Sequence, residues 1–439
     1  MNSYPSSELG VIIRKVRKER GLRLEDLADD NISPATISNV ERGVPHVSTD
    51  KALYLLKKLN IGLDQVPQML KRKREEIRKL NFKLLGVESL FSNGKWEKAL
   101  EILHSLELED SHLLAPKAYY LKGKCLIKAK RWKKAERELH KAIQLASQQA
   151  DVENIEAAGF NELAIIYYSQ NDLENALQFI ESGIDAFDTE RERQYLYYLL
   201  TLNKAIFLER LGRLNESMNV VTEVWDSLYC LDESDTVLTF YWLRSELLRR
   251  LGQHRGAEEY VLEGIDIARR NSDFNLLFDL WTVMGSSYIN QEKWDEAEFC
   301  FEQALSLDGV KEHKFIQTFS WLGMLYINQK EWNKAFPVLE KALSLGKKHN
   351  DVPRYIQAIH VMGDYYRERG EAEKAIEQYH QALELSRKHD LLKREYAAVF
   401  RLAECWEGQN KEEFSKATAN MYEVQRKLAK EGAQILDGA

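Results

Sequence analysis

Residues 8–66 have the hydrophobic pattern of five short helices. In "ELGVIIRKVRKERG" the apolar residues recur every three or four positions and share one helix face, with basic residues on the other. These apolar residues are Leu9, Ile12, Ile13 and Val16. Gly21 is expected to end this helix. The next stretch, "LRLEDLADD", predicts a second helix that adds Leu24, Leu27 and Ala28 to the core.

The stretch "SPATISNVERG" predicts a third helix with defined ends. Ser33 is a natural N-cap, Pro34 a natural first helical residue and Gly43 a natural stop. Ile37 and Val40 are expected to face inward. The outer face then carries Ala35, Thr36, Ser38, Asn39 and Arg42. A fourth helix follows in "STDKALYLLKKLNI", capped by Ser48 or Thr49 and packed through Leu53, Leu56 and Leu59.

The rest of the chain is repetitive, as three segments show: "VMGSSYINQEKWDEAEFCFEQALSL", "WLGMLYINQKEWNKAFPVLEKALSL" and "VMGDYYRERGEAEKAIEQYHQALEL". In each, a glycine is followed 12 residues later by an alanine. Small residues at these positions let two antiparallel helices cross closely, while Phe301, Leu339 and Tyr379 fill the groove between units. Tryptophans at the turn into the second helix are expected to pack structurally: Trp96, Trp132, Trp294 and Trp332.

This pattern resembles the tetratricopeptide repeat family, with 36 to 41 residues between units over residues 81–430. The resemblance implies an all-α chain in which about nine helix pairs form a right-handed superhelical solenoid. The first helix of each pair would line the concave wall. In the family's register, the inward-facing residues include Asn161, Trp242, Glu246, Arg249, Arg250, Thr282, Asn290, Asn328, His360, Asp364 and Arg367, with Asn203 one position off.

Asparagines along such a wall indicate a groove for an extended peptide. One side-chain amide offers both a donor and an acceptor, so it can pair with one peptide unit of a ligand without reading the ligand's side chains. The other interpretation is that each asparagine lies on a solvated helix face. The predicted peptide-binding residues are Asn161, Asn203, Trp242, Glu246, Arg249, Thr282, Asn290, Asn328, Asp364 and Arg367.

The N-terminal helices resemble the helix-turn-helix domain of the lambda-repressor (Xre) type, through "IRKVRKERGL", "LEDLA", "TISNVERG" and "ALYLLKKLNI". The resemblance implies that the third helix enters the major groove of DNA. Leu24 replaces the family's usual glutamine, the turn is one residue shorter than usual, and Pro34 and Ala35 donate no side-chain hydrogen bond. The predicted DNA-binding residues are Arg23, Ala35, Thr36, Ser38, Asn39, Arg42, His46 and Lys51. The alternative is a degenerate motif that serves only docking or dimerisation.

The balance of charged residues changes at about residue 80, between the N-terminal helices and the repeats. Residues 1–80 hold 16 Lys and Arg against 11 Asp and Glu, whereas the remainder holds 46 against 58. Only the first part is therefore expected to meet phosphates. We predict a DNA-binding domain at 1–66, a linker helix at 67–80, the peptide-sensing repeats at 81–430 and a C-terminal tail at 431–439. The basic run of the linker is interpreted mainly as a solvated helix face and secondarily as a phosphate contact.

Other features exclude several classes of protein. The four cysteines are far apart, which favours buried thiols over a disulfide or zinc site. Neither a membrane span nor a secretory signal is predicted, so we expect a cytoplasmic protein. No catalytic, metal-binding or cofactor-binding motif is found, and no enzyme is predicted.

The combination of an Xre-type domain with long-period repeats resembles the RRNPP group of peptide-responsive quorum-sensing regulators, most closely its PlcR/NprR-like members. The resemblance implies a transcription regulator, a homodimer or peptide-dependent oligomer, that binds a palindromic operator in double-stranded DNA under the control of a short linear peptide. One alternative is a regulator that binds a phosphorelay response-regulator protein through its repeats. The other is a repeat scaffold with a weak DNA-binding domain.

Overall fold

The protein is built from α-helices, and the computed structural model describes residues 6–44, 48–148, 151–231 and 234–437. Within these ranges, the one β-type pairing is an isolated bridge between Asp29 and Ile32. The chain divides into two compact units, residues 1–128 and 129–439. None of the described helices is both long enough and apolar enough to cross a membrane.

The first unit begins with four short helices around one apolar core, one fewer than the sequence predicted for residues 8–66, because the next described helix begins only at Val66. They are α1 (Ser6–Glu19), α2 (Leu24–Leu27), α3 (Pro34–Glu41) and α4 (Thr49–Lys58). The predicted core residues of this region are confirmed, although α2 is shorter than the sequence suggested. The fully enclosed members are Leu9, Ile12, Ile13, Val16, Leu27, Ile37, Val40, Leu56 and Leu59, with Leu24, Ala28 and Leu53 packed partly buried against them.

The predicted helix ends are confirmed by their hydrogen bonds. Ser33 Oγ accepts a bond from the backbone amide of Thr36 at 3.2 Å, which caps α3. At α4 the cap is Ser48, whose Oγ accepts from the amide of Asp50 at 3.1 Å. Gly21 and Gly43 end their helices with φ of 68° and 67°, a left-handed conformation that glycine adopts without steric cost.

Helix α5 (Val66–Ser92) runs unbroken from the predicted linker into the first predicted repeat. Its first turns belong to the N-terminal core, because Val66 and Leu70 are buried in that cluster. Farther along, Leu84 and Val87 are buried as well. Helix α6 (Trp96–Ser105) packs against both α5 and α7 (Ala115–Lys128). The predicted domain boundaries at residues 66 and 80 stay predictions, and both lie within this one helix.

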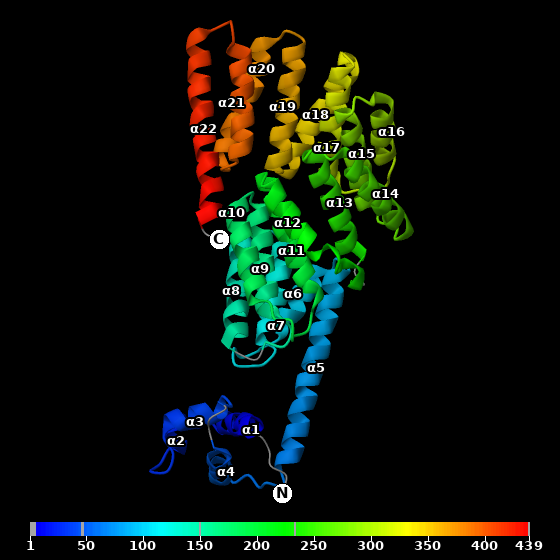
Figure 1. Cartoon of the computed structure of the whole chain (residues 1–439). Helices are drawn as coiled ribbons and strands as arrows, with labels where there is room; N and C mark the ends of the chain where they lie inside the picture. Colours follow the sequence, from blue (N-terminus) through cyan, green and yellow to red (C-terminus); the bar gives the residue numbers. More distant parts are fainter. Residues whose placement is uncertain (1–5, 45–47, 149–150, 232–233, 438–439) are drawn as a thin grey trace. The chain divides into compact units, whose positions relative to one another are not determined.

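The second unit is a row of antiparallel helix pairs (Figure 1). The odd-numbered helices from α9 to α21, which are the first helices of the pairs, also contact one another in order and so form one wall. The helices are α8 (Trp132–Gln148), α9 (Ile155–Ser169), α10 (Leu173–Ala186), α11 (Tyr195–Leu211), α12 (Leu214–Trp225), α13 (Ser234–Arg250), α14 (His254–Arg270), α15 (Phe274–Asn290), α16 (Trp294–Leu305), α17 (Phe315–Asn328), α18 (Trp332–His349), α19 (Val352–Glu368), α20 (Ala372–Lys388), α21 (Leu392–Trp406) and α22 (Lys411–Asp437), with the short 3-10 helices η1 (Leu228–Cys230) and η2 (Glu312–Lys314).

The small residues of the repeat lie where the two helices of a pair touch. A Cβ atom added to Gly285 would come within 2.7 Å of the Phe301 ring, so no larger side chain fits without movement. Gly363 meets Tyr379 in the same way. The predicted packing of a small residue against a large one is therefore confirmed. The four predicted turn tryptophans each stand as the first residue of α6, α8, α16 or α18.

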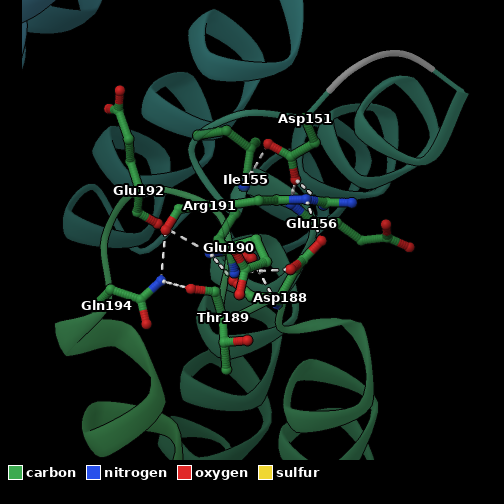
Figure 2. A network of polar contacts seen from close by, with 10 residues as sticks. Asp151, Ile155, Glu156, Asp188, Thr189, Glu190, Arg191, Glu192 and Gln194 are labelled. Carbon is green, nitrogen blue, oxygen red and sulfur yellow. Dashed lines mark hydrogen bonds and ion pairs between the residues drawn. The ribbon is translucent and has the colours of Figure 1, made fainter.

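The loop between α10 and α11 is tied to the loop that precedes α9 (Figure 2). Asp151 accepts a hydrogen bond from the backbone amide of Ile155 at 3.0 Å and forms an ion pair with Arg191 at 3.5 Å. Gln194 Nε2 donates to the carbonyl of Thr189 at 2.7 Å. These bonds fix the starts of α9 and α11, two helices that carry predicted groove residues.

Early and late helices of the second unit also meet, at a contact that we call the seam. Asn171 Nδ2 donates to the carbonyl of Asn350 at 3.0 Å, although 179 residues separate them. Leu173 is buried in the same apolar cluster as Val352. Lys393 Nζ bonds to the carbonyl of Gly212. The seam brings the start of α21 next to the end of α11.

Candidate functional site

The outer face of α3 carries the polar residues predicted to read DNA bases. Arg42 Nη2 donates to Asn39 Oδ1 at 2.5 Å, which orients the Asn39 amide. Thr36 Oγ1 lies 2.9 Å from the capping Ser33 Oγ. Ala35 and Arg42 are exposed, and Thr36, Ser38 and Asn39 are half-buried. This face can therefore offer an oriented amide to base edges in a groove of DNA, and an arginine to the phosphates beside that groove.

Exposed cations lie elsewhere in the same unit. Arg23 and Lys51 are both exposed, as a phosphate contact requires. His46 lies outside the described residues. Leu24, where the family usually has a glutamine, packs partly against the apolar core. The DNA-binding role of these side chains stays a prediction.

A cavity of about 450 Å³ opens in the wall formed by the first helices of the second unit. Five residues that the sequence placed on the concave side line it: Trp242, Glu246, Arg249, Arg250 and Asn290. The other lining residues are Glu209, Arg210, Leu214, Gln317, Trp321, Gln357 and Arg394. The cavity thus collects side chains from six of these first helices, α11 to α21.

Some of the lining residues that were not predicted could have been recognised from the repeat register. Glu209 and Arg210 stand four and five residues after the small position Ala205, as Arg249 and Arg250 do after Ser245. Gln317 and Gln357 each stand six residues before a repeat glycine, and they reach the wall because the long first helices add a turn. Arg394 has no such signal, because the seam alone brings α21 to this place.

The acidic groups of this cavity already have cationic partners. Glu246 and Arg249 form a two-point ion pair at 2.6 and 2.8 Å, and both side chains are buried. Glu209 bonds to Arg250 and lies 3.5 Å from Arg210 Nε. Although burial alone would raise it, the pKa of Glu209 is held below its ordinary value by Arg210, Arg250 and other arginines nearby. Glu209 is therefore charged at neutral pH.

A second cavity, of about 590 Å³, shares Arg210 and Trp242 with the first. The two together make a longer polar groove along the wall. Lys314 and Asp279 form an ion pair in its lining. Burial lowers the pKa of His313, also in the lining, to about 4, so this ring is neutral at physiological pH.

Asn161 and Asn203 lie together on α9 and α11. Asn203 Nδ2 donates to Asn161 Oδ1 at 2.8 Å, and only 2% of Asn161 is exposed. The structure therefore joins the two predicted peptide-holding residues, but it places them in neither cavity. Their binding role stays a prediction.

The remaining predicted residues are spread along the wall. Thr282 is buried and bonds to Thr318 at 2.7 Å, whereas Asn328 is exposed at the end of α17. Asp364 is held by Arg401, with bonds of 2.9 and 3.2 Å. Arg367 bonds to Glu404. The buried His360 has no hydrogen-bond partner at Nε2. Among the described residues, no group of three His, Cys, Asp or Glu side chains could hold a metal ion.

Family models match both the N-terminal helices and the repeats. A helix-turn-helix family model matches residues 13–66. Tetratricopeptide repeat models match residues 278–309, 315–388 and 360–429. The chain is a helix-turn-helix protein with a tetratricopeptide-repeat body. A model described as "Anaphase-promoting complex, cyclosome, subunit 3" matches residues 79–142. No curated protein matches the sequence.

Two solved structures share the fold. One is a Rap protein complexed with Competence and Sporulation Factor, at 12% identity and a TM-score of 0.60, covering 80% of this chain and 99% of the other. The other is the apo form of the quorum sensor NprR from B. thuringiensis, at 16% identity and a TM-score of 0.56, covering 76% and 97%. The resemblance to the RRNPP group is confirmed at the level of domains and fold.

Proposed function

We propose that the protein is a cytoplasmic transcription regulator whose DNA binding is controlled by a short linear peptide in the repeat groove. The observation that carries the proposal is the joining, in one chain, of a reading helix with an oriented Asn39–Arg42 pair and a repeat wall with a polar cavity of about 450 Å³. A cavity of this size is in the range that binds small ligands.

The chemistry of each part supports its role. On α3, Asn39 can pair with adenine through its amide, and Ala35 can contact a thymine methyl. In the repeat body, the amides of Asn290, Gln317 and Gln357 can pair with a peptide backbone. NprR is named a quorum sensor, and the Rap structure holds Competence and Sporulation Factor, so this fold serves signal-responsive proteins.

Coupling between the two parts would act through geometry. Two copies of the chain would read a palindromic operator only with half-sites about 34–36 Å apart, or multiples of that. A peptide that changes the pitch of the repeats, or the arrangement of a homodimer, would change that spacing. Because α3 offers few side chains for direct base contacts, the spacing of the two DNA-binding domains is the main means by which the peptide controls DNA binding.

The test is a selection of DNA by the full chain. Purified protein is mixed with sheared genomic DNA of its source organism at stepped salt, with and without a synthetic random heptapeptide pool, and the retained DNA is sequenced. We expect retained fragments to share a two-fold symmetric motif, to lose affinity steeply as salt rises, and to change in yield when peptides are present. The double variant Asn39→Ala, Arg42→Ala should abolish the motif without unfolding the protein.

A scaffold with a weak DNA-binding domain would give a different result. It would retain no common motif at any salt concentration, with or without peptides. That outcome would remove the DNA-binding half of the proposal and would favour the alternative of a protein-interaction regulator.

A further inference from the structure

The wall of the 450 Å³ cavity has more positive than negative charge. It is lined by four arginines and two glutamates. Glu246 is fully engaged by Arg249, with two bonds of 2.6 and 2.8 Å. Glu209 is shared between Arg250 and Arg210. Neither glutamate hydrogen-bonds to the fourth arginine, Arg394, although Glu209 Oε2 is without a hydrogen-bond partner and the Glu209 charge acts on Arg394 from nearby.

Within the described part of the chain, the Arg394 guanidinium has no direct partner, although the charges of Glu209 and Asp351 act on it from a distance. Among the described residues, its side chain makes neither a hydrogen bond nor an ion pair. Burial, followed by the positive charges of Arg250 and Arg210, lowers the pKa of Arg394 to about 10, so the guanidinium is still charged at neutral pH. A charged group among like charges favours an anion at that place.

A second donor without a partner belongs to a residue of the same lining. Trp321 lines the cavity, and its buried Nε1 has no hydrogen-bond partner. The guanidinium of Arg249 lies 4.8 Å from the centre of the Trp321 ring, which places further positive charge beside it. Buried donors are normally paired, so an unpaired indole N–H and an unpaired arginine in the lining of one cavity indicate a ligand with acceptor atoms.

We propose that Arg394 and Trp321 form a subsite that binds a carboxylate of the regulatory peptide. This inference rests on the proposed function and adds the chemistry of the ligand to it. A carboxylate offers two oxygens, which match the forked donors of an arginine and leave a lone pair for the indole N–H. The carboxylate comes either from the peptide's C-terminus or from an Asp or Glu side chain.

The place of Arg394 links the subsite to the fold. Arg394 follows Lys393, which bonds to Gly212 across the seam. Arg210 and Arg250, whose charges oppose that of Arg394, come from the early side of the second unit. A bound carboxylate relieves this repulsion and so stabilises the contact between α11 and α21. Binding of the acid is therefore coupled to closure of the seam.

The experiment uses three random heptapeptide pools on the immobilised full chain, with captured peptides identified by mass spectrometry. The first pool has all amino acids and a free C-terminus, the second has all amino acids and an amidated C-terminus, and the third is amidated and lacks Asp and Glu. We expect the third pool to be captured at least tenfold less than the first. Equal capture of the first and second would assign an acidic side chain, and loss in the second would assign the C-terminus.

Variants sharpen this result. Arg394→Gln should remove the preference for acidic peptides, while Arg270→Gln, an exposed residue of α14 with the same charge change, should preserve it. If Arg394→Gln does not fold, the comparison of pools on the unmodified protein still decides. Equal capture of all three pools would overturn the subsite and leave the peptide groove standing. No capture from any pool would overturn both the subsite and the peptide-binding half of the proposed function.

Discussion

Arg17 in the N-terminal domain and Arg394 in the repeat body are both arginines set among packed helices, but only Arg17 has partners for its charge. Arg17 binds Glu41 through two bonds, of 2.6 and 2.8 Å, and donates a third to the carbonyl of Leu22 at 2.7 Å. Arg394 has no such partner among the described residues and faces a cavity. The charge of Arg17 therefore belongs to a structural ion pair, whereas the charge of Arg394 is available to a ligand.

The two regions differ in their packing as well. In the N-terminal domain, Gly10 of α1 lies against the backbone carbonyl of Val40 in α3, and backbone cannot move aside. In the repeats, Gly363 faces the ring of Tyr379, which is fully buried and donates a hydrogen bond to Asp364 at 2.8 Å. We infer that the crossing in the N-terminal domain is the more rigid of the two, because it is formed by backbone, whereas the crossing in the repeats is formed by a side chain.

The largest effect is expected from Gly10→Ala. Its new methyl group would overlap the carbonyl of Val40, so the variant should destabilise the N-terminal domain by about 3 kcal/mol. Gly363→Ala should cost less, about 2 kcal/mol, because a ring edge has to move rather than a backbone carbonyl. Urea unfolding, followed by hydrogen exchange of α1 and α19 amides, measures both. The control Gly256→Ala meets nothing closer than 3.6 Å and should be neutral or mildly stabilising. Equal costs at Gly10 and Gly363 would contradict the difference in rigidity.

The next effect is expected at the Arg17–Glu41 pair. Glu41→Leu leaves Arg17 without its carboxylate and should destabilise the N-terminal domain by about 2 kcal/mol. Adding Arg17→Met should restore most of that loss, because an apolar pair replaces the charged one. The same hydrogen-exchange measurement reports both variants. An unchanged stability in Glu41→Leu would mean that the pair is not structural.

A smaller effect is expected on the exposed face of α3. Arg42→Ala should weaken DNA binding about tenfold and reduce the slope of log affinity against log salt by about one. Fluorescence anisotropy with the selected DNA fragment measures it over a range of salt concentrations. Arg269→Ala, an exposed arginine of α14, is the matched control and should leave the slope as it is. A slope that Arg42→Ala does not change would exclude a phosphate contact for Arg42.

The smallest effect on stability is expected at Arg394. Because it has no partner to lose, Arg394→Met should change the free energy of unfolding by less than about 0.5 kcal/mol, or raise it slightly. Thermal unfolding of the peptide-free protein tests this. A loss of about 2 kcal/mol, as at Glu41, would show that Arg394 is a structural residue and would remove the basis for a ligand subsite.

Much of the fold could be predicted from residues that lie close together in the sequence. Ser33 and Gly43 bound α3, and the glycines at 285, 323 and 363 mark the helix crossings, because caps and close packing depend on near neighbours. The repeat register placed Trp242 and Glu246 on the cavity wall for the same reason.

The sequence could not show which inward-facing side chains are hydrogen-bonded to other residues of the protein and which are available to a ligand. Asn161 looks like a ligand contact in its register, but it bonds to Asn203 and is almost fully buried. Arg394 looks like a surface residue at the start of a helix, yet the seam places it in the cavity. Both outcomes depend on residues about 40 to 180 positions away, so no local pattern records them.

The central claim is that occupation of the repeat groove controls DNA binding. The most direct measurement is the affinity of the full chain for its selected DNA fragment, by fluorescence anisotropy, at increasing concentrations of a peptide captured from the pools. We expect at least a fivefold change in DNA affinity at saturating peptide, and an equal change in peptide affinity when DNA is present, because coupling between two binding sites is reciprocal. A peptide that binds the groove and leaves the DNA affinity unchanged would contradict it.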